Sequence, residues 1–161
     1  FVEEMKSRGA PIPKDIRLIA SAEEGVKEAD IICTATTSSK PVFDGKALRP
    51  GTHINAVGAY TPQMQEVDSE TIRRAKVVID SRQASLAEAG DLIIPLQQGL
   101  ITEKHIYAEI GEIVTGLRPG RESKDEITYF KSVGVAVQDI AAARRVLDKA
   151  TELGLGNEVE L

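Results

Sequence analysis

Three short segments of the sequence could bind a polar ligand, because each places small or hydroxylated residues directly after an apolar stretch. They are Ala35, Thr36 and Thr37 after IICT, Val57, Gly58 and Ala59 after HINA, and Ser132, Val133 and Gly134 after ITYFK. Small side chains allow a ligand to approach exposed backbone amides, and hydroxyl groups can donate hydrogen bonds to it. Turns also favour Gly, Ser and Thr for conformational reasons, so one such segment alone decides nothing. Three of them on one predicted edge favour a nucleotide-type site.

The apolar stretches before these segments predict short strands. Residues 31–36 (IICTAT) are continuously apolar or β-branched, as expected for a strand buried on both faces of a sheet. The other predicted strands are 15–20 (DIRLIA), 52–58 (THINAVG), 76–80 (KVVID) and 127–137 (ITYFKSVGVAV).

Amphipathic segments alternate with these strands and predict helices. Ser21 lies three residues before Glu24, which is the spacing of a capping box, and begins a predicted helix over 21–30. Further helices are predicted over 61–76, 81–90 and 138–154. The alternation predicts an α/β fold, with a mostly parallel sheet and helices on both faces. In such sheets ligands bind beyond the carboxyl ends of the strands.

The middle of the chain is less regular. Pro95 and Gly99 interrupt residues 91–106 as helix breakers, and the following segment predicts only a short helix and a Gly/Pro-rich loop.

The composition excludes several classes of protein. A length of 161 residues suits one domain, while the net charge of −5 and the 4% aromatic content argue against a nucleic-acid or anionic-membrane surface. No apolar run approaches the roughly 20 residues of a transmembrane helix. The single cysteine, Cys33, cannot form an internal disulfide, so the sequence predicts a cytoplasmic protein. His53 and His105 belong to no cluster with ligand spacing, and no metal site is expected.

The beginning of the chain predicts a fragment. FVEEMKSRGA resembles the end of an amphipathic helix that has no capping residue, with Gly9 as its stop. The sequence contains no GxGxxG and no P-loop, although a dinucleotide fold places its glycine loop after the first strand. Both observations follow if the glycine loop and an acidic ribose ligand lie upstream of Phe1. The alternative is a natural domain whose first helix is short.

Five collinear blocks resemble the ornithine cyclodeaminase/mu-crystallin family. They are ADIICTATTSSKPVF, LRPGTHINAVGAYTPQMQEVD, VVIDSRQASLAEAGDL, EIGEIVTGLRPGR and ITYFKSVGVAVQDIAAA. The resemblance implies a Rossmann domain that binds NAD or NADP, and a separate domain that binds the substrate and dimerises. It implies that residues 1–137 form part of the nucleotide-binding domain. Residues 138–161 would form a C-terminal helical segment that packs towards the missing substrate domain.

The resemblance also assigns roles to individual residues. The segments 35–37, 57–59 and 132–134 match the cofactor-contacting positions of the family. Glu88 matches a carboxylate near the substrate pocket, where it could bind an ammonium group or transfer a proton; an exposed helix glutamate is the alternative. Tyr60 stands where ornithine cyclodeaminases carry an aspartate. A phenol is neutral at neutral pH and cannot replace that carboxylate as a base. The alternative for Tyr60 is that its side chain only packs against the missing domain.

The sequence therefore predicts part of an NAD(P)-dependent oxidoreductase acting on the C–N bond of an amino acid or cyclic imino acid. Tyr60 and Glu88 are the expected catalytic residues. The full-length protein is expected to be a homodimer, and the fragment alone to be inactive. Two alternatives remain open at this point: an ornithine cyclodeaminase that uses bound NAD, and a non-catalytic, crystallin-like module that binds NAD(P)H or another small molecule.

Overall fold

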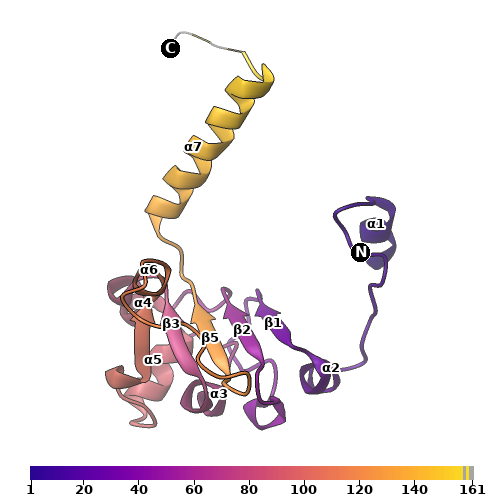
Figure 1. Cartoon of the computed structure of the whole chain (residues 1–161). Coiled ribbons are helices and arrows are strands. Elements are labelled where there is room, and N and C mark those ends of the chain that lie inside the picture. Colours follow the sequence, from indigo (N-terminus) through magenta and orange to yellow (C-terminus); the bar gives the residue numbers. More distant parts are fainter. Residues whose placement is uncertain (158, 160–161) are drawn as a thin grey trace.

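The computed structural model describes residues 1–157 and 159, and its centre is a five-stranded parallel sheet (Figure 1). The strands are β1 (Ile31–Thr34), β2 (His53–Ala56), β3 (Lys76–Ile79), β4 (Ile106–Glu109) and β5 (Thr128–Lys131). Their order across the sheet is β1-β2-β5-β3-β4, so the last strand inserts between the second and the third. The parallel sheet confirms the predicted α/β fold class.

The five strands end in one row. Thr34 pairs with Ala56, Ala56 with Lys131, Lys131 with Ile79, and Ile79 with Glu109. Because parallel strands run in the same direction, the segments that follow them emerge side by side at the carboxyl edge. The three small segments selected from the sequence therefore begin at neighbouring points of this edge.

Helices and 3₁₀ turns precede, connect and follow the strands. They are α1 (Val2–Ser7), α2 (Ala22–Glu28), α3 (Ser69–Arg74), α4 (Arg82–Glu88), α5 (Gly90–Gln97), α6 (Ile110–Val114) and α7 (Ala136–Leu153), with the 3₁₀ turns η1 (Gly45–Ala47) and η2 (Glu103–His105). Side chains of Ser21, Asp68 and Ser81 accept a backbone N–H at the starts of α2, α3 and α4. These bonds satisfy donors that a helix N-terminus leaves without an intrahelical partner. The helix start predicted at Ser21 is confirmed.

One face of the sheet carries the hydrophobic core. Ile54, Val77 and Tyr129 point into it from β2, β3 and β5, and all three are fully buried. Ile72 of α3 and Leu92 of α5 belong to the same core. This packing explains the alternation of buried and half-buried residues along the three central strands.

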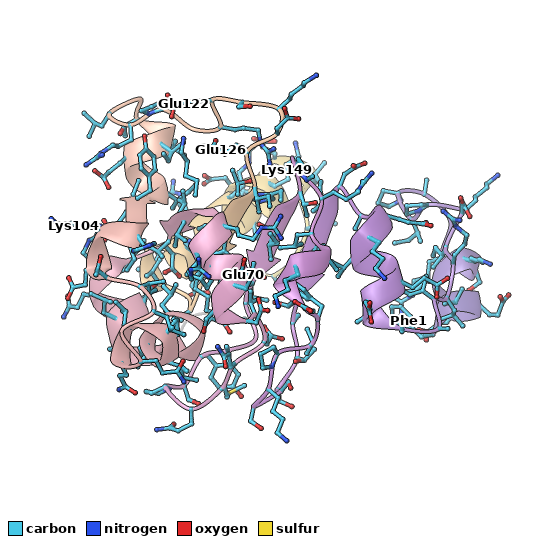
Figure 2. All side chains as sticks on the ribbon, turned by 90° about the horizontal axis from the view of Figure 1, so that it is seen from below. Phe1, Glu70, Lys104, Glu122, Glu126 and Lys149 are labelled. Carbon is cyan, nitrogen blue, oxygen red and sulfur yellow. The ribbon has the colours of Figure 1, made fainter. Side chains whose placement is uncertain are left out.

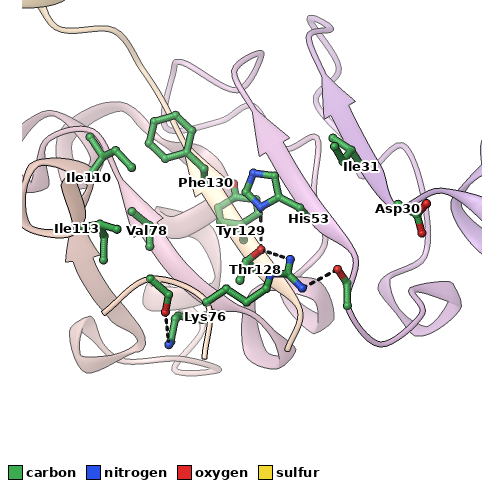
Figure 3. A pocket seen from close by; sticks show the side chains of 13 residues that line it. Asp30, Ile31, His53, Lys76, Val78, Ile110, Ile113, Thr128, Tyr129 and Phe130 are labelled. Carbon is green, nitrogen blue, oxygen red and sulfur yellow. Dashed lines mark hydrogen bonds between the residues drawn. The ribbon is translucent and has the colours of Figure 1, made fainter. Parts of the chain in front are cut away.

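The opposite face is covered far less. Ile31 on β1 is 65% exposed, and Val78 and Phe130 are only half-buried. Ile110 and Ile113 of α6 lie beside Val78 on this face (Figure 3). The sequence predicts that β1 is buried on both faces of the sheet. This prediction is wrong, because Ile31 of β1 is largely exposed on this face.

Two predicted elements differ in the structure. Residues 15–20 form no strand, and Leu18 and Ile19 are 85% and 56% exposed. A short strand needs a hydrogen-bonded neighbour, and within the described residues β1 pairs only with β2. The helix expected over 61–76 begins only at Ser69, where Asp68 provides the cap.

The sequence patterns predict neither α5 nor β4. α5 contains Pro95, which was expected to break a helix, and it begins at Gly90, which was expected to end the preceding one. Among the strands that the structure describes, β4 lies at an edge of the sheet and pairs only with β3. Its four residues, IYAE, carry too short a pattern to be separated from the helix that follows.

The terminal helices stand apart from the sheet. α7 projects away from it (Figure 1), and none of the helix is buried. Gly154 ends the helix in the left-handed conformation (φ +64°), as predicted, and residues 158, 160 and 161 of the expected C-terminal segment lie outside the described residues. The segment with Phe1 lies beyond α2 (Figure 2). Of the helices that the structure describes, none combines the length and the apolar composition needed to cross a membrane.

Candidate functional site

The candidate site is the carboxyl edge of β1, β2 and β5. Residues 35–37 are exposed after β1, and Val57 is 46% exposed after β2. Gly58 and Ala59 are buried, whereas Ser132 and Val133 are half-buried and Gly134 is exposed. The structure thus brings the nine expected cofactor-binding residues to neighbouring turns. Ala35, Thr36, Thr37, Val57 and Gly134 offer the most accessible surface.

A buried carboxylate joins the first two of these turns. Glu66 lies between β2 and α3 and is fully buried. One carboxylate oxygen accepts the N–H of Thr36, and the other accepts the N–H of Gly58 at 2.7 Å. Burial would raise the pKa of Glu66, but the bonds from these two segments outweigh it and hold the pKa below its ordinary value. Glu66 is therefore ionised at neutral pH.

The same carboxylate explains why position 58 is glycine. A Cβ built on Gly58 would overlap the carbonyl oxygen of Thr36 and the carboxyl group of Glu66. The small residue was expected to leave room for a ligand. In the structure it leaves room for Glu66.

A second carboxylate shapes the turn after β5. Asp80 follows β3 directly, and one of its oxygens accepts the hydroxyl of Ser132 at 2.9 Å. The same oxygen accepts the N–H groups of Val133 and Gly134 at 2.8 and 2.9 Å. Burial would raise the pKa of Asp80, but these bonds and that from Ser81 N–H lower it below the ordinary value. The Ser132 hydroxyl donates inward, so towards a ligand it presents only an acceptor.

A fully buried ion pair lies beneath both carboxylates. Asp91 Oδ1 accepts the N–H groups of Glu66 and Val67 at 2.8 and 3.0 Å. Its Oδ2 accepts the Tyr129 hydroxyl at 3.1 Å and lies 3.6 Å from Lys131 Nζ. Burial raises the pKa of Asp91 and lowers that of Lys131, while their mutual attraction opposes both changes. The Lys131 ammonium makes no hydrogen bond within the described residues.

The two expected catalytic residues lie on separate elements. Tyr60 is 50% exposed after β2, and Glu88 is an exposed residue at the end of α4. A Cβ on Gly90 would overlap the carbonyl oxygen of Met64 and come within 2.7 Å of that of Thr61. The chain just after Glu88 therefore touches the chain just after Tyr60. Neither side chain is engaged in a hydrogen bond within the described part of the chain.

The buried polar residues are only weakly indicated by sequence patterns. Lys131 occupies an inward position two residues after Tyr129, where the alternation calls for an apolar side chain. Asp80 follows an apolar strand without an intervening turn residue. The roles of Glu66 and Asp91 depend on partners 8 to 38 residues away in the chain, which no local pattern identifies.

A cavity of about 540 Å³ lies elsewhere, on the open face of the sheet (Figure 3). His53, Thr128 and Phe130 line it, and His53 Nδ1 lies 2.7 Å from Thr128 Oγ1. The described residues contain no group of three or more His, Cys, Asp or Glu placed to hold a metal ion. The cavity takes no residue from the three turns, so it is distinct from the predicted site.

A parallel α/β sheet with small turns along its carboxyl edge is an architecture in which nucleotide ligands bind outside the strand ends. The chain belongs to the ornithine cyclodeaminase/mu-crystallin family, whose model matches residues 5–154. The resemblance found in the sequence is therefore confirmed.

Pyrroline-2-carboxylate reductases are among the most similar relatives. Delta(1)-pyrroline-2-carboxylate reductase of Bacillus cereus is 48% identical over 148 residues, which cover 91% of this chain and 45% of the relative. The structure of Thermococcus litoralis Delta(1)-pyrroline-2-carboxylate reductase in complex with NADH and L-proline matches with a TM-score of 0.90 and 45% identity, covering 98% of this chain and 48% of that one. An archaeal alanine dehydrogenase dimer with bound NAD matches with a TM-score of 0.84 and 36% identity, over 99% and 48% of the two chains. This chain thus spans about half the length of the relatives it matches.

Proposed function

We propose that the protein containing this chain is an NAD(P)H-dependent reductase of a cyclic imino acid, with Δ1-pyrroline-2-carboxylate as substrate and proline as product. The observation that carries this proposal is the match to the Thermococcus litoralis enzyme in complex with NADH and L-proline, at a TM-score of 0.90. Since the chain spans about half of that enzyme, the activity belongs to the full-length protein, and this chain alone is expected to be inactive.

The carboxyl edge suits a nicotinamide cofactor. Its three turns are adjacent in the sheet, and a Cβ on Gly134 would meet only open space, so a flat ring could approach the backbone there. We assign cofactor binding to residues 35–37, 57–59 and 132–134. When bound, the cofactor supplies the hydride that reduces the C=N carbon.

Tyr60 and Glu88 are assigned to the substrate side of the site. The Tyr60 hydroxyl can donate a hydrogen bond to the substrate carboxylate, and Glu88 can hold the imine nitrogen in its protonated form. A protonated imine accepts hydride at carbon and becomes the amine with no further proton needed at nitrogen. The contact of Gly90 with the carbonyl oxygens of Thr61 and Met64 brings the segments that carry the two residues together, which supports this assignment.

The arrangement of the full-length protein follows the same proposal. Residues 1–137 belong to the nucleotide-binding domain, and the apolar residues exposed on α7 pack against the substrate domain. Ile140 and Val146 of α7 are 69% and 68% exposed, as expected for a helix that lacks its partner. A homodimer is proposed because the archaeal alanine dehydrogenase is a dimer.

The test is a reductase assay on the full-length protein, with Δ1-pyrroline-2-carboxylate and NADH or NADPH. We expect loss of the reduced-nicotinamide absorbance together with formation of proline. Release of ammonia and proline from L-ornithine, without net consumption of cofactor, would instead identify a cyclodeaminase. Tight cofactor binding without turnover of any imino acid would identify a binding module.

A further inference from the structure

The contacts of Glu66 connect two turns that are distant in sequence. Its carboxylate accepts N–H groups from Thr36, thirty residues away, and from Gly58, eight residues away. The two turns follow the adjacent strands β1 and β2. One side chain therefore fixes the distance and orientation between two of the three turns assigned to the cofactor.

The backbone of Glu66 is itself held by Asp91. Asp91, in the first turn of α5, accepts its backbone N–H at 2.8 Å. Val67, the next residue, donates its N–H to the same Asp91 oxygen and is fully buried. The position of the Glu66 backbone is thus set by the core, and its side chain transmits that position to the turns.

Only an ionised carboxylate fits this place. Each of its two oxygens faces an N–H donor, so both must act as acceptors. A glutamine of the same length would place an NH₂ group against one of the two N–H donors. An aspartate would be one methylene too short to reach both turns.

We propose that Glu66 is a positioning residue for cofactor binding, which joins the turns at Thr36 and Gly58 into one rigid surface. This inference rests on the proposed function, because that function assigns the cofactor to these turns. It also adds a constraint. The N–H groups of Thr36 and Gly58 point into the protein, so they do not bind the cofactor, and the remaining groups of the turns must do so.

The first test compares two variants of the full-length protein. Glu66→Gln replaces two charge-assisted hydrogen bonds with one neutral bond and a contact between two donors, so the dissociation constant for NADH should rise by about 10-fold or more. Ile72→Val is the matched control. Ile72 is a core residue of α3, outside both turns, so the substitution lowers stability without altering either turn. It should leave NADH affinity within about 2-fold of the original protein. The KM for the imino acid, measured at saturating NADH, should change little in either variant.

The outcomes separate the two proposals. If the unmodified protein binds no reduced nicotinamide, the proposed function and this inference both fail. If it binds NADH while Glu66→Gln binds equally well, or while both variants weaken binding alike, the function stands and the positioning role is wrong. Gly58→Ala provides a second variant, since its methyl group would force the two turns apart and should reproduce the loss of affinity.

Hydrogen exchange gives a test that needs no variant. The N–H groups of Thr36 and Gly58 should be protected from exchange in the unliganded protein and remain so with NADH. Protection that appears only with NADH would mean that these groups bind the cofactor, which would overturn the inference.

Discussion

At the carboxyl edge of the sheet, buried carboxylates hold the connecting segments, whereas at the amino edge lysine and arginine side chains hold them. Glu66 and Asp80 accept backbone N–H groups of the three turns. Across the sheet, Lys76 Nζ donates to the carbonyl of Gly120 at 2.9 Å, and Arg121 donates to that of Gly51 at 2.7 Å. The two edges use opposite charges for the same task.

The signs of these charges match the direction of the chain, although the peptide groups that these side chains hold lie in turns and loops outside the helices. In a parallel sheet the connecting helices run against the strands, so their N-termini lie at the carboxyl edge and their C-termini at the amino edge. Helix N-termini leave N–H groups without partners, and C-termini leave carbonyls. Acceptors are therefore needed at one edge and donors at the other. The charged side chains at the two edges also differ in burial. Three substitutions test whether burial determines how much each edge contributes to the free energy of unfolding.

The largest effect is expected from Asp91→Ala. Asp91 and Lys131 have no exposed side-chain surface, so removing the carboxylate leaves a buried ammonium without its counter-charge. The free energy of unfolding, measured by urea denaturation, should fall by roughly 3–5 kcal/mol. Adding Lys131→Met should restore part of the loss. A fall no larger than that of the exposed control Lys27→Ala would show that the carboxyl edge does not depend on this pair.

Asp80→Asn should have an intermediate effect that depends on pH. The variant loses an ionised acceptor for five donors, which should cost about 1–3 kcal/mol at neutral pH. The pKa of Asp80 in the folded protein is lower than its ordinary value of 3.8. Its contribution is therefore complete above that value and is lost as the pH falls through the folded pKa.

Urea denaturation at neutral pH and at about pH 3 checks this dependence. The difference between the original protein and the variant should shrink in acid. Asp139→Asn on the exposed first turn of α7 is the control, and it should change stability little at either pH. A constant difference at both pH values would mean that the bonds of Asp80 do not require its charge.

The smallest effect is expected at the amino edge, from Lys76→Met. Lys76 pairs with Glu122 at 2.7 Å and Glu126 at 3.1 Å, two residues of one loop (Figure 2). Water reaches Glu122, so the variant should lose only about 1 kcal/mol, and less in high salt. Lys149→Met, which breaks the exposed pair with Glu152, should be nearly neutral. A loss as large as that of Asp91→Ala would remove the distinction between the edges.

Sequence patterns predicted the scaffold better than the polar interior. β1, β2, β3 and β5 lie within predicted strands, β1 because its apolar and β-branched residues are contiguous. The start of α2 was predicted because Ser21 and Glu24 have cap spacing. The three turns were selected because they directly follow strands. Residues 15–20 also carry an apolar pattern, but within the described part of the chain no strand pairs with them. Hydrogen-bonded partners cannot be deduced from a local pattern.

The roles of Glu66 and Asp91 lay beyond sequence reasoning for a related reason. In the sequence both are acidic residues that belong to no recognisable motif. Their structural roles depend on which backbone N–H donors the fold brings to their carboxylates. Gly58 is a residue whose small size is visible in the sequence but whose neighbours are not. The sequence pattern attributes its small size to a ligand, whereas the groups that a Cβ would overlap in the structure are the Thr36 carbonyl and a carboxylate of the same chain.

The row formed by the last residues of the five strands makes strand length intolerant of insertion and deletion. One residue more or less in β1, β2, β3 or β5 would shift its following turn by about 3.3 Å and turn its inward side chains outward. β4 already carries one extra residue in its pairing with β3. Among natural relatives, length differences should therefore collect in connections such as the loop that carries Glu122 and Glu126. The spacing from Ile31 to Thr34, and likewise within the other four strands, should stay fixed even where the residues themselves change.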